Sequence, residues 1–307
     1  MEIANPPRLL GTSPPVPAAH PRRADGTLPL KLPAIVVLLL WSTVPLLMTL
    51  WFSLQRYNLL NPGQESFAGL ENYRFLLTDP GLAAAIGNTL LLVGAVLAIT
   101  AGVGTLLAVL FDQDFFGCGA ARVLVIAPFF VMPTVSALIW KNMLMHPANG
   151  VISWVMTTLG LEPIDWFSSA PLASIIVIVA WQWLPFATLI LLTAIQALDP
   201  ERKEAARMDG AGPVAMFFHI ILPHLGRAIS VVLMIETLFL LSVFAEIFVT
   251  TAGGPGLAST NLTFLIYRYA LLEYDVGAAS VGGVIAIVLA NVVATFLVRA
   301  IARNIEA

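Results

Sequence analysis

Six long apolar stretches constrain the fold of this chain more than any other feature of its sequence. A helix rises about 1.5 Å per residue, so roughly 20 apolar residues cross a hydrocarbon core of about 30 Å. Charged residues make up 11% of the chain, against about 25% in an ordinary soluble domain. The sequence therefore predicts an all-α membrane protein with six transmembrane helices, at Leu32–Leu54, Ile86–Phe111, Val123–Trp140, Leu172–Ile195, Ile229–Thr250 and Val276–Ile301.

The third stretch is the shortest of the six and contains Pro128 and Pro133. Proline cannot donate the backbone hydrogen bond of a helix interior, and its ring collides with the preceding turn. We therefore expect a kink in this span, or an extension at one of its ends.

The lysines and arginines predict the orientation of the spans. Eleven of the fifteen lie in the N-terminal tail, the second and fourth connections and the C-terminal end, and the other four lie on the opposite side. Cytoplasmic loops carry the excess of these residues, so both termini are predicted to be cytoplasmic. Residues 1–31 are rich in proline and contain no long apolar run, which predicts a disordered cytoplasmic tail before a transport domain at residues 32–307.

Several function classes are excluded by what the sequence contains. The net charge of −3 provides no basic field for nucleic acid, and one cysteine with four scattered histidines makes a metal site improbable. A phosphate-binding loop needs glycine before its lysine, but Lys31, Lys141 and Lys203 follow leucine, tryptophan and arginine. The sequence thus predicts a non-catalytic chain that binds no cofactor, and any ATP and Mg²⁺ would be held by a partner.

The fourth connection, from about Gln196 to Ala228, is longer than the other cytoplasmic connection and is predicted to form two helices joined by a bend. Asp199 is suited to an N-cap and Pro200 to the first helical position. The helix-forming run that follows is stopped by glycine, and a second, apolar helix is expected from Pro213 to Ile221, with Pro223 breaking it. By composition this connection is either an ordinary solvated loop or a surface on which another protein docks.

A motif in this connection resembles the EAA loop of permease subunits of binding-protein-dependent ABC importers. The matching positions are Glu204, Ala205, Ala206, Gly210, Ile220, Leu222 and Pro223, at the spacing of that loop. The resemblance implies that the first helix docks on an ATP-hydrolysing subunit, with Glu204, Ala205, Ala206, Asp209 and Gly210 as the coupling residues.

The same resemblance implies the partners and the location of the chain. Six spans with one coupling loop correspond to half of a transporter, which implies a second homologous permease subunit and two ATPase subunits. An extracytoplasmic binding protein would deliver the substrate, and the chain would lie among the lipids of a bacterial inner membrane.

Further segments look like the carbohydrate-importing members of that group, namely Leu70–Tyr73, Asn88–Leu90 and Gly253–Pro255. Trp181–Phe186, Phe244–Thr251 and Ala258–Leu262 are most similar to permeases for sugar alcohols such as sorbitol and mannitol. A permease for another carbohydrate, such as a maltose or trehalose type of disaccharide, or for glycerol phosphate is the alternative.

Two carboxylates, Glu236 and Glu246, fall within the predicted fifth span. A charge at the bilayer centre costs about 2.5–3.5 kcal/mol on insertion scales, so such a group faces a cavity or a partner. Glu236 either lines a substrate pathway or pairs with a neighbouring helix, and a proton-coupled secondary transporter is a further alternative. Glu246 either belongs to the pathway or is interfacial.

Other polar and aromatic residues of the spans are candidates for substrate contact. Trp181, Gln182 and Trp183 combine aromatic faces with an amide, as sugar-binding surfaces do, but tryptophans also form belts at membrane interfaces. Asn88 and Ser242 either contribute to the same pathway or form hydrogen bonds between helices.

Overall fold

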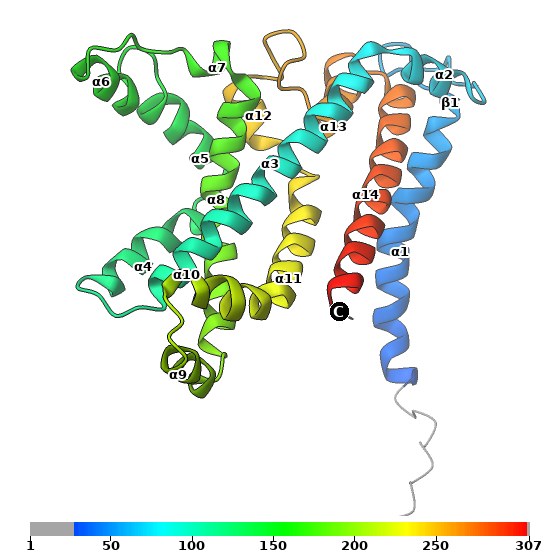
Figure 1. The fold of residues 1–307 in the computed structure, drawn as a ribbon. Helices are drawn as coiled ribbons and strands as arrows, with labels where there is room; N and C mark the ends of the chain where they lie inside the picture. The colour runs from blue at the N-terminus through cyan, green and yellow to red at the C-terminus, as the bar shows by residue number, and fades with distance from the viewer. Residues whose placement is uncertain (1–27, 306–307) are drawn as a thin grey trace, which may run out of the picture. The chain divides into compact units, whose positions relative to one another are not determined.

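The computed structural model describes residues 28–305 (Figure 1). The chain divides into two units at Leu47, and each is described by itself. The first unit contains the beginning of α1 (Leu28–Ser53), whose side chains are exposed from Lys31 to Leu47. The helix starts at Leu28, within the predicted tail, and the rest of that tail lies outside the described residues.

The second unit is almost entirely helical, which confirms the predicted fold class. Its bounds, in chain order, are β1 (Gln55–Arg56), β2 (Ser66–Phe67), α2 (Glu71–Thr78), α3 (Pro80–Phe111), α4 (Cys118–Ile126), η1 (Ala127–Phe130), α5 (Pro133–Ile139), η2 (Trp140–Leu144), α6 (Val151–Thr158), α7 (Trp166–Ser169), α8 (Pro171–Gln196), α9 (Pro200–Met208), α10 (Pro213–Met216), η3 (Phe217–Ile221), α11 (Leu222–Leu240), α12 (Ala245–Thr250), α13 (Leu262–Tyr267), η4 (Arg268–Leu272) and α14 (Val276–Ile305).

Five helices of the described chain are long and apolar enough to cross a membrane, and a bent pair can supply a sixth span. The pair is Cys118–Phe130 and Pro133–Leu144, which meet at 111°. The kink expected in the third span is therefore present, as a sharp bend at the expected prolines. Val131 and Met132 are extended there, and Pro133 opens α5, because a residue before proline is driven out of the helical region.

The predicted fifth span also ends earlier than expected. It stops at Leu240, and a separate short helix, α12, follows after four residues. No proline marks this break, so the apolar sequence alone predicted a single helix to Thr250. Glu236 and Glu246 consequently lie on different helices.

Pro223 does not break the helix before the fifth span, contrary to the prediction. Pro213–Leu240 runs as one helix of 28 residues. A π-helical turn, η3, ends two residues before Pro223, and the amide of Leu222 donates to the carbonyl of Phe217. The wider turn takes up the missing donor and the bulk of the proline ring within the helix.

Helices α3 and α8 form the centre of the second unit, and α11 packs against both. A Cβ on Gly104 of α3 would lie only 3.0 Å from the Cβ of Ala187 on α8, so small side chains allow the two backbones to approach closely. Buried aliphatic residues of α3, α8 and α11 fill the rest of this contact.

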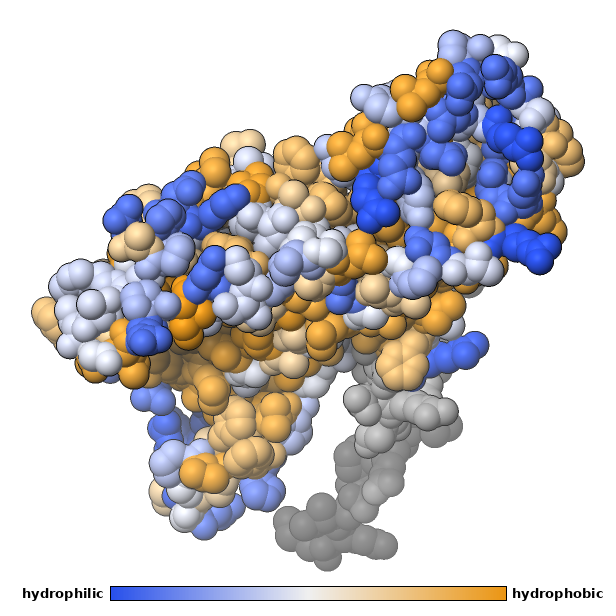
Figure 2. Space-filling model, turned by 90° about the horizontal axis from the view of Figure 1, so that it is seen from above, coloured by the Kyte–Doolittle hydropathy of each residue, from blue (hydrophilic) through white to orange (hydrophobic). Residues whose placement is uncertain are grey.

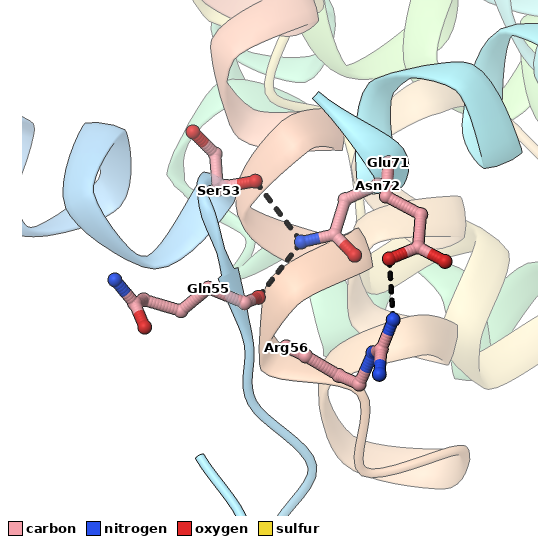
Figure 3. A network of polar contacts seen from close by, with 5 residues as sticks. All are labelled: Ser53, Gln55, Arg56, Glu71 and Asn72. Carbon is pink, nitrogen blue, oxygen red and sulfur yellow. Dashed lines mark hydrogen bonds and ion pairs between the residues drawn. The ribbon is translucent and has the colours of Figure 1, made fainter. Parts of the chain in front are cut away.

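Polar contacts fasten the segment after α1 to α2 (Figure 3). The side-chain amide of Asn72 donates to the carbonyl oxygens of Ser53 and Gln55, at 3.0 and 2.7 Å. Arg56 and Glu71 form an exposed ion pair beside it. Seen from above, hydrophilic residues gather over the part that contains β1, β2 and α2 (Figure 2).

Candidate functional site: the α9 segment and the buried polar contacts

The helix predicted after Asp199 is present as α9. Asp199 caps it, because its side chain accepts a hydrogen bond of 3.0 Å from the amide of Glu201, and Pro200 follows at the first position. Glu201 lies in the first turn and Arg207 in the last, where each charge complements the helix dipole.

The helix ends in a Schellman motif centred on Gly210. The amide of Gly210 donates to Arg207 and that of Ala211 donates to Ala206, at 3.0 and 2.9 Å. Gly210 has a φ of +82°, and a Cβ there would meet nothing within 4 Å. The bend thus needs glycine for its backbone conformation and not for space.

The outer surface of the bend is exposed and partly apolar. No residue of α9 is buried. Met208, Val214 and Phe218 are 89%, 70% and 56% exposed. Such large apolar side chains, gathered on one short segment, are typical of an interaction surface.

The residues of the EAA match, taken together with Asp209, divide into two sets. Exposed residues are Glu204, Ala205, Asp209, Gly210 and Pro223. The half-buried residues are Ala206, Ile220 and Leu222, of which Ala206 and Ile220 pack against the core formed by α3, α8 and α11. Ala205 thus faces outward while its neighbour Ala206 faces the chain's own core.

An ion pair joins α9 to the end of α3. The Nζ of Lys203 lies 2.7 Å from the Oδ2 of Asp112, and the two side chains are 20% and 23% exposed. Beside the pair is a cavity of about 310 Å³, lined by residues of α3, α9, α10 and η3. The motif match included neither residue of this pair.

Glu236 lies at the contact between α11 and α3. Its Oε2 accepts a hydrogen bond of 2.6 Å from the hydroxyl of Thr100, and both residues are fully buried. The other carboxyl oxygen, Oε1, is buried without a partner. This geometry is that of an interhelical contact, one of the two interpretations given above.

Gln182 on α8 contacts the break in the third span. Its amide donates to the carbonyl of Val131 at 2.9 Å, while its Oε1 is buried without a partner. The bend leaves this carbonyl without a helical donor, and buried backbone groups require one.

The two tryptophans beside Gln182 have different surroundings. Trp181 packs edge-on against Trp140, with ring centroids 5.7 Å apart. Trp183 packs against Phe129, Phe186 and Phe239, and the ring of Phe239 lies 5.2 Å away. The structure therefore separates the predicted aromatic group into two.

Asn88 and Asn261 hold the chain after the break in the fifth span. Asn88 donates to the carbonyls of Leu257 and Thr260, both at 2.9 Å. Asn261 donates to the carbonyl of Val243 at 2.5 Å and caps α13 by accepting from Phe264. Asn261 thus donates to a backbone carbonyl at the break in the fifth span, as Gln182 does at the break in the third span.

The last two candidates lie at the same break. Ser242 is exposed, and its hydroxyl donates to the carbonyl of Phe239 at 2.8 Å. Glu246 is 5% exposed and lies in the first turn of α12. Glu246 and Glu236 are not brought together by any hydrogen bond or ion pair among the described contacts.

Sequence reasoning missed Thr100, Asp112, Lys203 and Asn261 as contact residues. Asp112 and Lys203 are 91 positions apart, and Thr100 and Glu236 are 136 apart. Their only local signal was a polar side chain in or beside an apolar run. In the described part of the chain, no three His, Cys, Asp or Glu residues form a possible metal site.

The family model for the binding-protein-dependent transport system inner membrane component matches residues 122–307. A probable ABC transporter permease protein, y4oQ of Sinorhizobium fredii, is 36% identical over 80% of each chain. The trehalose/maltose transport system permease protein MalF of Thermococcus litoralis is 30% identical, over 87% of this chain and 89% of that protein.

A crystal structure of a bacterial ABC transporter involved in the import of the acidic polysaccharide alginate shares the fold. The TM-score is 0.76 at 24% identity, with 90% of this chain and 94% of that chain covered. The chain therefore belongs to the family of binding-protein-dependent transport system inner membrane components and is a non-catalytic permease subunit of an ABC importer.

Proposed function

We propose that this chain forms half of the translocation pathway of an ATP-driven importer for a sugar or a sugar alcohol, a polyol such as sorbitol or mannitol. The names of its relatives support a hydroxyl-rich substrate, since they concern trehalose and maltose, sn-glycerol 3-phosphate and sulfoquinovosyl glycerol. A maltose- or trehalose-type disaccharide or glycerol phosphate is the alternative substrate.

The observation that carries the coupling role is the exposed surface of the α9 segment. Glu204, Ala205 and Asp209 are exposed there beside Met208. An alanine permits close approach of a partner surface. Burial of the apolar Met208 side chain under a partner lowers the free energy of the complex. Ala206 packs α9 against the chain's own core, and Ile220 does the same for the helix that follows. Leu222 is half-buried, while Gly210 and Pro223 shape the backbone.

The proposed complex contains a second homologous permease subunit, two ATPase subunits that hold ATP and Mg²⁺, and an extracytoplasmic binding protein. In this arrangement α9 and both termini lie on the cytoplasmic side of a bacterial inner membrane. Lys203 and the arginines of this segment support that side, by the excess of positive residues in cytoplasmic loops.

The substrate pathway is proposed along the break in the fifth span. Trp183 and Phe239 form an aromatic pair there, and the exposed hydroxyl of Ser242 lies one turn beyond Phe239. Aromatic faces with a few polar groups are typical of small-molecule sites. Trp181, Gln182, Asn88, Glu236 and Glu246 lie on the elements that frame this break and remain pathway candidates.

Reconstitution of the complete complex into proteoliposomes tests this function. Labelled sorbitol, mannitol, maltose and glycerol 3-phosphate are offered with the binding protein outside and ATP on the ATPase side. We expect saturable, ATP-dependent uptake of one hydroxyl-rich compound, and no uptake when the ATPase carries a disabled phosphate-binding loop.

Uptake that persists without any ATPase subunit would overturn the proposal in favour of a secondary transporter that uses Glu236. Uptake of glycerol 3-phosphate or maltose but of neither polyol would replace the polyol with the alternative substrate class. Uptake of none of the four compounds would reject the proposed substrate class altogether.

A further inference from the structure

The α9 segment has few attachments to the rest of its own chain. None of the residues 200–208 is buried. Among the described side chains, Ala206 supplies a packing contact to the core, and Lys203 supplies the ion pair to Asp112. Apart from its two covalent ends, these two contacts are therefore the described side-chain links through which a movement of α9 reaches the rest of the chain.

The Lys203–Asp112 pair is the least exposed of the three ion pairs in the described residues. The side chains are 20% and 23% exposed, against 36% or more for each partner of the other two pairs. Shielding from solvent strengthens the attraction between the charges, because they are screened less than a surface pair.

A cavity lies beside the ion pair, between α9 and α3, so the ion pair is the contact that bridges the two helices there. Its volume is about 310 Å³, and Asp112, Lys203 and Arg207 line it together with Val109 and Met216. Apolar packing between the two helices is interrupted by this space. A push or pull on α9 therefore reaches α3 through the charged pair more directly than through packed side chains.

The end of α3 is in turn connected to the helix that leaves the α9 segment. From Asp112, α3 runs back twelve residues, about 18 Å, to Thr100, which bonds to Glu236 on α11. Glu236 lies on the continuous helix Pro213–Leu240, which begins three residues after Gly210. Both partners of the buried contact are thus joined to the α9 segment, one by an ion pair and the other by a continuous helix.

We propose that Lys203 and Asp112 are positioning residues that make α3 follow α9 when the ATPase moves it. The pair turns the motion of an exposed helix into a motion of α3 against α11, at the contact between Thr100 and Glu236. This inference rests on the proposed coupling function of α9 and assigns a transmission role to two residues outside the EAA match.

The test uses the complete complex in proteoliposomes and measures ATP hydrolysis and substrate uptake together. Lys203→Met and Asp112→Asn should leave subunit assembly and ATP hydrolysis near wild type while uptake falls about tenfold, within the range of coupling between distant sites. The number of ATP molecules hydrolysed per substrate imported should therefore rise. A merely structural role would lower assembly, hydrolysis and uptake in parallel.

Three further variants sharpen the test. The exchange Lys203→Asp with Asp112→Lys restores the pair with reversed charges and should recover most of the coupled uptake. Lys203→Arg should keep it as well. Arg202→Met removes an exposed charge from the neighbouring position of α9 and should leave the ATP-to-substrate ratio unchanged.

Unchanged uptake in Lys203→Met, or an exchange variant that assembles but remains uncoupled, would overturn the role of the pair. A parallel loss of assembly and uptake would make these residues structural and overturn it too. Failure of the proposed function is a separate outcome, because the wild-type complex would then show no ATP-dependent uptake.

Discussion

The hydroxyl of Thr100 on α3 and the carboxyl group of Glu236 on α11 are 2.6 Å apart, and neither side chain is accessible to solvent. A polar pair in this position joins two spans that otherwise meet through aliphatic side chains. The carboxyl group depends on this bond, because its other oxygen has no partner and a buried polar group without a partner loses the hydrogen bonds it makes in water.

Thr100→Val keeps the shape of the side chain but removes the hydroxyl. We expect it to lower the free energy of unfolding by about 1–3 kcal/mol, since the carboxyl group then lacks its partner. Thermal unfolding of the purified protein in detergent measures the effect. Thr105→Val is the matched control, because Thr105 is also buried in α3 but bonds only to Ala101 of its own helix. Equal effects of the two substitutions would contradict the role of the interhelical bond.

Gly210→Ala should loosen the end of α9 without a steric clash. The positive φ costs an ordinary residue about 1–2 kcal/mol, which corresponds to roughly 5–30-fold faster hydrogen exchange of the capping amides at residues 210 and 211. Asparagine tolerates this conformation better, so Gly210→Asn should show a smaller increase. Gly212→Ala is the control, because the φ of Gly212 is −71° and a Cβ there meets nothing within 4 Å. Similar exchange rates in the Gly210 and Gly212 variants would rule out the conformational explanation.

Gln182→Leu should destabilise the protein by leaving the carbonyl of Val131 without its donor. The expected loss is about 1–3 kcal/mol, measured as a fall in thermal stability. Gln196→Leu at the exposed end of α8 is the control and should change stability little. If Gln182→Leu instead weakens only the apparent affinity for substrate and leaves thermal stability intact, Gln182 acts in the pathway and not at the break.

Asp79 makes the folding stability of the protein depend on pH in the acidic range. Its carboxylate accepts a hydrogen bond of 2.6 Å from the hydroxyl of Tyr269 and one of 2.9 Å from the amide of Gly81. The bond from Tyr269 lowers the pKa of Asp79, while partial burial opposes this shift. Because the folded pKa is the lower one, the stabilisation is complete above the unfolded value of about 3.9 and is lost as the pH falls through the folded value.

The difference in thermal midpoint between the wild type and Asp79→Asn should therefore narrow as the pH falls from about 5 to about 3. Asparagine still caps α3, so the substitution isolates the charge. In a Tyr269→Phe background the same substitution should have a smaller effect, because the main cause of the lowered pKa is then absent. A difference that stays constant with pH in the wild-type background would refute this account.

The sequence predicted the spans well where local rules decide them, and less well where distant contacts do. Pro128 and Pro133 marked the break in the third span, because proline acts on its own backbone. The break after Leu240 has no such mark: its carbonyls at Leu241 and Val243 are held by Thr263 and Asn261 from a later helix. The periodicity and composition of the apolar run do not predict a contact with a residue of a later segment.

The same distinction applies to the candidate site. Asp199, Pro200 and Gly210 predicted the bounds of α9 from local capping chemistry, and the structure confirms those bounds. The pairing of Lys203 with Asp112 could not be predicted, because a charged residue in a sequence does not indicate which of many distant charges it will meet.

The two broken spans have a consequence for how the protein is made. Gln182 follows the Val131 carbonyl by 51 residues, and Asn261 follows the Val243 carbonyl by 18. Synthesis proceeds from the N-terminus, so each broken segment leaves the ribosome before the amide that will seal it. A bare carbonyl is costly in hydrocarbon, so we expect each broken segment to stay beside water or the insertion machinery until its amide has been synthesised. Stable insertion of each broken span therefore depends on a side-chain amide that lies later in the sequence.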